Sequence, residues 1–166
     1  MFSSHPFPWF FFVVVVVIII IIIIIFSSSS SSFFFFLSFF LRPSGLVPVD
    51  RLLVSDTNPR ARQRLLRAYP QLAVGDNNIT VAQRADIVVL AVKPQTVDAV
   101  LVEMRGHLRR DTVLVSIVAG KTVRQLRKRA GGAPNIARCM PNTPAIIGQS
   151  MTVWTCDSVF DHVGSC

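Results

Sequence analysis

After residue 45, the hydrophobic positions of the chain follow two periods in turn. Short runs rich in valine, isoleucine and leucine, nearly all without charge, recur, and stretches with apolar residues at helical spacing separate them. The runs predict β-strands over 52–55, 72–74, 87–92, 112–118, 135–140 and 151–155. The intervening stretches predict helices over 59–68, over 80–85, from the proline at 94 to about 108, and from 122 to about 130. Strands alternating with helices indicate a parallel α/β sheet.

Local signals place the ends of several of these elements. Asn58 followed by Pro59 is a good helix start, an N-cap and then proline at the first helical position. We expect both Leu65 and Leu66 to face inward from that helix. Thr122 can cap the last helix, and two glycines at 131 and 132 end it. The unbroken β-branched run over 87–92 is typical of a strand buried on both faces.

The first 41 residues differ from the rest because they contain no charged side chain. Residues 9–26 form an apolar run made almost wholly of Phe, Val and Ile homopolymers, and a serine block follows. Its length makes 9–26 a possible membrane span, although the basic region of a signal peptide is missing. The alternative, which we favour, is low-complexity sequence joined to an unrelated coding segment, for instance by a gene-model error. We therefore divide the chain into segment 1–41, a domain over 45–156 and a tail over 157–166.

The net charge of +8 lies wholly beyond residue 41. Much of it belongs to arginines at helical spacing, which favours solvated helix faces over an anion-binding surface. No aromatic residues interleave with these arginines, so we expect no nucleic-acid partner. Three cysteines without CxxC spacing argue against a metal site and against a disulfide framework.

Candidate chemistry lies where the predicted strands end, because ligands of parallel sheets bind at the carboxyl ends of strands. Four loops leave such ends, at 55–58, 93–95, 119–121 and 141–144, and this layout suits a nucleotide cofactor. Asp56 could bind the two hydroxyls of a ribose, or it could form an Asx-turn that positions Pro59. Asn58 and Arg60 fit a ribose phosphate instead, so NAD and NADP both stay open. Lys93 could contact a phosphate or ribose, or it could simply be a solvated lysine at the end of the strand, and the sequence favours neither role. No catalytic residue can be assigned.

Several motifs then occur in a fixed order. They are Gly45-Leu-Val-Pro, Val54-Ser-Asp-Thr-Asn-Pro, Asn78, Ala85-Asp-Ile-Val-Val-Leu-Ala-Val-Lys-Pro-Gln95, Ser116-Ile-Val-Ala-Gly120, Met140-Pro-Asn-Thr-Pro-Ala145 and the segment 148–152. As a set they resemble the pyrroline-5-carboxylate reductases, the family that catalyses the last step of proline synthesis. The resemblance covers about two thirds of the chain.

The resemblance implies a Rossmann-like domain that binds NADP, with NAD possible. It implies that the cofactor is lined by Ser55, Asn58, Asn78, Ala91, Val92, Lys93, Pro94, Ala119 and Gly120. It also implies that Asn142, Thr143 and Pro144 lie near the nicotinamide. In the family, hydride passes from the nicotinamide to the imine carbon of 1-pyrroline-5-carboxylate and gives proline. The cofactor carries this chemistry, which agrees with the lack of an acid–base pair in the sequence.

The chain departs from the family pattern at both ends. A glycine-rich phosphate loop and its strand would precede Gly45, where the chain has homopolymers, and a helical dimer domain would follow Cys156. We therefore expect an incomplete doubly wound parallel sheet that lacks its central strand and is inactive by itself. The alternative is a non-enzymatic, membrane-tethered remnant that serves as an interaction module. The expected location is cytoplasmic by resemblance, or membrane-associated if 9–26 is a genuine span.

Overall fold

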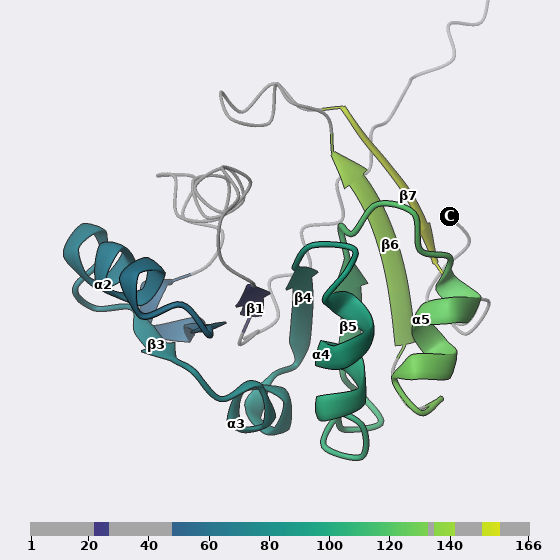
Figure 1. Ribbon diagram of the computed structural model, residues 1–166, viewed down its shortest axis with the longest axis horizontal. Coiled ribbons are helices and arrows are strands. Elements are labelled where there is room, and N and C mark those ends of the chain that lie inside the picture. Colours follow the sequence, from purple (N-terminus) through teal and green to yellow (C-terminus); the bar gives the residue numbers. More distant parts are fainter. Residues whose placement is uncertain (1–21, 27–47, 133–134, 142–150, 157–166) are drawn as a thin grey trace, which may run out of the picture.

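A computed structural model describes residues 22–26, 48–132, 135–141 and 151–156. In this part of the chain seven strands form one sheet, in the order β3-β2-β1-β4-β5-β6-β7 (Figure 1). Neighbouring strands are parallel except for the antiparallel pair β6 and β7. The order of the first six strands is that of a Rossmann sheet. The strands are β1 (Ile22–Phe26), β2 (Leu52–Asp56), β3 (Ala73–Gly75), β4 (Ile87–Ala91), β5 (Val113–Ser116), β6 (Asn135–Pro141) and β7 (Thr152–Cys156).

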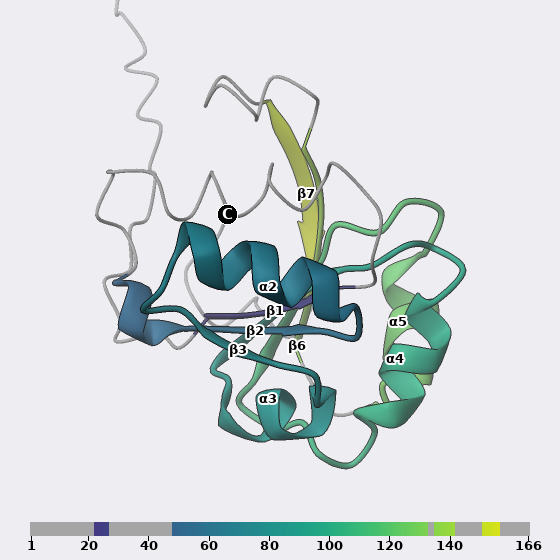
Figure 2. The ribbon, with the colours of Figure 1, turned by 60° about the vertical axis from the view of Figure 1, so that its left-hand side comes forward.

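Helices cover both faces of the sheet. Figure 2 shows α2 on one side of β1, β2 and β3, and α3 on the other side. Helices α4 and α5 lie on the same side as α3, so the sheet is doubly wound. The helices are a 3-10 turn over Val49–Arg51, α2 (Pro59–Ala68), α3 (Asn78–Arg84), α4 (Val97–Glu103) and α5 (Val123–Arg129).

The two faces of the sheet bury separate apolar clusters. Under α3, α4 and α5, the fully buried side chains include Leu90, Leu101 and Leu114. Under α2, Leu65 packs in a cluster with residues of β2 and β4, such as Leu52. Burying one side chain of this size stabilises the fold by about 1.5–3 kcal/mol relative to leaving it in water. These clusters hold the strand ends of the sheet in fixed relative positions.

The central strand of the sheet comes from the isoleucine tract, so our expectation that it is missing was wrong. Strand β1 pairs with β2 on one side and with β4 on the other, and Ile24 lies opposite both Val54 and Val89. The physical reason is that a strand between two parallel neighbours needs β-branched apolar residues and little else. A run of isoleucines meets that need although it carries no turn signals.

The predicted membrane span also needs correction over the residues that the structure describes. Its last five residues, Ile22–Phe26, form β1 and are not helical. No helix within the described part of the chain is long and apolar enough to cross a membrane. Residues 9–21 of the predicted span lie outside the described residues.

Most of the other predicted elements are confirmed with shifted ends. Asn58 caps α2, and Thr122 caps α5 with a capping box. The helix after Pro94 ends at Glu103, earlier than we predicted, because Gly106 follows with a φ of +80° and turns the chain. Leu65 is buried as predicted, whereas Leu66 is 43% exposed, since successive helical residues cannot both face one core.

Candidate functional site

The carboxyl ends of the parallel strands meet at one edge of the sheet. Phe26, the last residue of β1, lies opposite Asp56 of β2 and Ala91 of β4. Leu90 of β4 lies opposite Ser116 of β5 in the same direction. The loops after β2, β4 and β5 therefore all leave this edge. Between β1 and β4 the strand order reverses, which is where Rossmann sheets bind their ligands.

The loop after β2 is ordered by its own side chains. The Asp56 carboxylate accepts a hydrogen bond from the Asn58 backbone N–H at 2.7 Å, and the Asn58 side chain accepts one from the Arg60 N–H at 2.9 Å. Arg62 donates to the Asp56 carbonyl oxygen at 2.7 Å. Since Arg60 itself is exposed at the start of α2, the loop presents a cation at the positive end of the helix dipole.

Asp56 has the contact that an Asx-turn requires. Its side chain is held inside the loop, and the residue is only 1% exposed. Burial raises the pKa of this carboxyl above its ordinary value, while the Asn58 N–H and the nearby Arg62 and Arg64 act in the opposite direction. The Asx-turn interpretation is thus confirmed as local structure, and a ribose contact by the same carboxylate stays a prediction.

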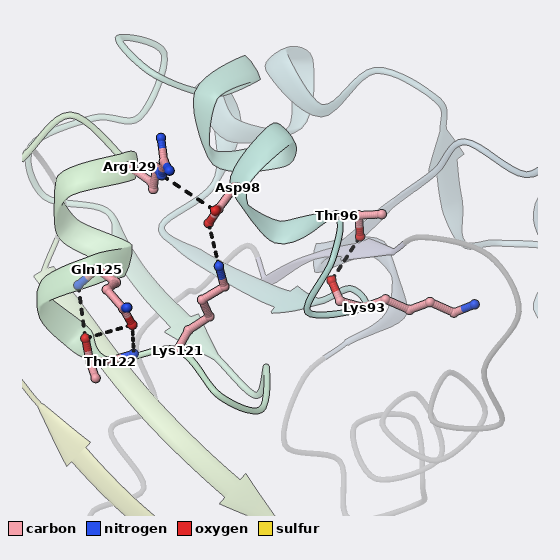
Figure 3. A network of polar contacts seen from close by, with 7 residues as sticks. All are labelled: Lys93, Thr96, Asp98, Lys121, Thr122, Gln125 and Arg129. Atoms are coloured by element: carbon pink, nitrogen blue, oxygen red, sulfur yellow. Dashed lines mark hydrogen bonds and ion pairs between the residues drawn. The ribbon is translucent and has the colours of Figure 1, made fainter.

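The loop after β4 is a tight turn. Ala91 and Val92 are buried, at 7% and 6% exposure, and Lys93 and Pro94 are exposed. The Thr96 N–H and the Thr96 hydroxyl both donate to the Lys93 carbonyl oxygen at 3.0 Å, which closes the turn just before α4. Figure 3 shows the Lys93 side chain extending away from α4. Pro94 fixes its own φ and restricts the backbone of Lys93 to extended conformations.

The loop after β5 turns through Ala119 and Gly120, which are both exposed. Gly120 has a φ of +71°, a conformation that residues with a Cβ adopt only at a cost. A Cβ built at Gly120 would meet no atom within 4 Å. The glycine is thus required here by the backbone conformation rather than by crowding within the protein.

Ser55 and Asn78, two of the predicted cofactor residues, contact each other below this edge. The Ser55 hydroxyl donates to the Asn78 side-chain oxygen at 2.8 Å, and the Asn78 amide donates to a carboxylate oxygen of Glu103 at 2.8 Å. Ser55 is 0% exposed and Asn78 is 3% exposed. The structure therefore places these two residues as a buried support of the loops, tied to the end of α4.

No signal in the sequence reveals the roles of Glu103, Asp98 and Lys121, which lie near this edge. Glu103 binds Asn78 across 25 residues, and Asp98 binds Lys121 across 23. An acid near the start of a helix, such as Asp98, is usually explained by the helix dipole alone. Pairings between side chains so far apart in the chain become visible only in the folded structure.

The remaining candidates are less constrained. Strand β6 ends at Pro141, and Asn142, Thr143 and Pro144 lie outside the described residues. Cys139 is only partly buried, and burial raises the pKa of its thiol. Within the described ranges, no three His, Cys, Asp or Glu side chains are grouped so that they could hold a metal ion.

Comparison with known proteins identifies the family. Residues 44–120 match the family model described as NADP oxidoreductase, coenzyme F420-dependent. The pyrroline-5-carboxylate reductase of Haemophilus influenzae is 35% identical over 104 residues, 63% of this chain and 38% of that protein. The enzyme of Pisum sativum is 35% identical over 112 residues, 66% of this chain and 39% of that protein. The chain thus spans well under half the length of these relatives.

Solved structures show the same fold. Plasmodium falciparum pyrroline carboxylate reductase, solved with NADP bound, aligns with a TM-score of 0.65 at 22% identity, over 81% of this chain and 47% of that one. The sequence matches, the family model and the Rossmann strand order agree with one another. The comparisons therefore support the assignment of the α/β part of this chain to the N-terminal NADP-binding domain of the pyrroline-5-carboxylate reductase family.

Proposed function

We propose that the carboxyl edge of the sheet binds NADP(H). The observation that carries this proposal is the convergence of the loops after β2, β4 and β5 at the point where the strand order reverses. An extended dinucleotide needs such a shelf, with small residues and backbone N–H groups close to it. Ala119, Gly120, Ala91 and Pro94 supply small or rigid positions there.

The loop after β2 favours NADP over NAD. In NAD-binding sheets, an acid after this strand binds the ribose hydroxyls, whereas an arginine accommodates the extra phosphate of NADP. Here the Asp56 carboxylate is buried and bonded to Asn58, while Arg60 is exposed at the first turn of α2. The group that meets the ribose is thus a cation at a helix N-terminus, which suits a phosphate.

We infer further that this part of the chain provides cofactor binding for the reaction of its relatives, the reduction of 1-pyrroline-5-carboxylate to proline. When bound, the nicotinamide supplies the hydride. The residues of this chain bind and orient: Lys93 offers a cation at the end of β4, and the Gly120 turn lets the backbone approach. No residue of the described part is assigned to proton transfer.

Gly120→Ala tests the proposal, because it changes a single backbone conformation at the edge. Alanine at a φ of +71° costs about 1–2 kcal/mol, or the peptide turns over and misdirects its N–H. We expect NADPH to bind on the order of tenfold more weakly, which corresponds to about 1.4 kcal/mol. A fluorescence titration of the full chain with NADPH measures this.

Gly132→Ala is the matched control. Gly132 has a φ of +82° and equally open space, but it lies after the end of α5. Both variants should lose similar stability in urea unfolding, and only Gly120→Ala should lose affinity. Equal affinity losses in the two variants, or no saturable binding of NADPH to the unmodified chain at millimolar concentration, would refute the proposal.

A further inference from the structure

Asp98 connects two loops of the proposed cofactor site. It is the second residue of α4, which begins directly after the Lys93 turn. One oxygen of its carboxylate accepts a hydrogen bond from the Lys121 ammonium group at 3.0 Å (Figure 3). Lys121 follows Gly120 directly in the chain. A single ion pair thus joins the turn after β4 to the turn after β5.

Both ends of this connection are anchored by further hydrogen bonds. On the side of Asp98, Thr96 closes the turn onto the Lys93 carbonyl oxygen with two bonds. On the side of Lys121, the capping box of Thr122 and Gln125 fixes the start of α5, with bonds of 2.9 and 3.2 Å. The turn before α4 and the start of α5 are thus each ordered by their own hydrogen bonds. What the ion pair adds is to set the distance between the two turns.

The surroundings make this pair stronger than an ordinary surface pair. The side chain of Lys121 is 22% exposed and that of Asp98 is 38% exposed. Water and salt screen partly buried charges less than fully exposed ones. The second oxygen of Asp98 lies 3.6 Å from Arg129, which is 54% exposed and sits at the far end of α5. Arg129 therefore contacts the same carboxylate without contacting either turn.

We propose that Asp98 is a positioning residue for the cofactor, acting through Lys121 on the distance between the Lys93 turn and the Ala119–Gly120 turn. The inference rests on the proposed function, since it assumes that NADP lies across these turns. A dinucleotide that spans two loops binds well only when their separation is already correct in the free protein. In this proposal Asp98 acts through Lys121 and not by contacting the cofactor.

Replacing Asp98 with asparagine separates positioning from simple electrostatics. The change Asp98→Asn removes a negative charge near the site, so Coulomb's law alone predicts tighter binding of the anionic NADPH. Loss of the ion pair predicts the opposite. We expect Asp98→Asn to bind NADPH about threefold to tenfold more weakly, a change that corresponds to about 0.7–1.4 kcal/mol. Asp98→Glu, which keeps a carboxylate, should recover most of the affinity.

A second readout works without cofactor. In the full chain, amide hydrogen exchange over residues 117–122 should be faster in Asp98→Asn and in Lys121→Gln than in the unmodified chain. The control Arg129→Gln should change neither this exchange nor NADPH affinity. Unchanged exchange in Asp98→Asn, or equal or tighter NADPH binding, overturns the inference. If the unmodified chain binds no NADPH, the proposed function fails, and the exchange result still decides whether Asp98 orders the turns.

Discussion

Replacing Ile24 with proline is expected to unfold the α/β sheet. Ile24 is the middle residue of β1, which is hydrogen-bonded to β2 and to β4. Proline removes a ladder N–H, and within sheets it is found essentially only on edge strands, at the first residue of a strand or at bulges. Domains of this kind are stable by only about 5–15 kcal/mol. Urea unfolding followed by circular dichroism should show a large loss of stability or no cooperative transition.

The homopolymer complicates this test and also sharpens it. Residues 18–25 are all isoleucine, so a strand that slides along the tract would present the same side chains to its neighbours. Combining Ile20→Pro with Ile24→Pro prevents a shifted isoleucine segment from replacing the original strand. The control Ile24→Val keeps the N–H and the β-branch, and should cost at most about 1.5 kcal/mol. Wild-type stability in the double proline variant would show that the tract does not form the central strand.

Replacing Asn78 with leucine should have the second largest effect. The change removes the partner of the Ser55 hydroxyl, which is fully buried, and the donor to Glu103. A buried polar group without a partner costs about 1–3 kcal/mol. We expect the midpoint of urea unfolding to fall by the corresponding amount, even though leucine has the same branching as asparagine.

A second substitution tells support from direct cofactor contact. The double variant Asn78→Leu with Ser55→Ala no longer has the Ser55 hydroxyl that Asn78→Leu leaves without a partner. Much of the lost stability should therefore return. If Asn78 only supports the loops, NADPH affinity should recover in parallel with stability. If the Asn78 amide contacts the cofactor itself, affinity should stay low in the double variant. A single variant as stable as the unmodified chain would contradict the hydrogen bonds that we describe.

The loops of the site could be predicted because each has a strong local signal. Lys93 and Pro94 follow an uncharged β-branched run that is typical of a buried strand, and Ala119 and Gly120 follow another. A proline and a glycine mark the turns directly in the sequence. Parallel strands then bring these turns to one edge without further information. This is why the turns at 93–95 and 119–121 could be placed from the sequence, whereas the cofactor roles of 91–94 and 119–120 rest on the resemblance and stay predictions.

The central strand could not be predicted because its sequence is uniform. An isoleucine run fits a strand, a buried helix or a membrane span equally well when no turn residues bound it. Only pairing with Val54 and Val89 on the two neighbouring strands decides between them. The pairing arises from the fold as a whole, since two strands with open edges on either side require a partner between them.

The polar contacts that organise the site were hidden for a different reason. Asp98 and Lys121, like Asn78 and Glu103, come from different β–α units. Their side chains meet because α4 packs beside α3 and α5, and no local pattern encodes that packing. The turn residues could be recognised in the sequence, and the resemblance pointed to Ser55 and Asn78, but no signal revealed the pairing of Asn78 with Glu103 or of Asp98 with Lys121.

One measurement tests the central claim that the carboxyl edge holds NADP. Amide resonances of the full chain can be followed by NMR while NADPH is added. The account predicts saturable shifts concentrated at Arg60, Thr96 and Gly120, with NADH giving weaker binding. The amides of Ile87 and Val113, at the opposite edge of the sheet, should stay unchanged. Shifts concentrated at that opposite edge or on β7, or none at millimolar NADPH, would contradict it.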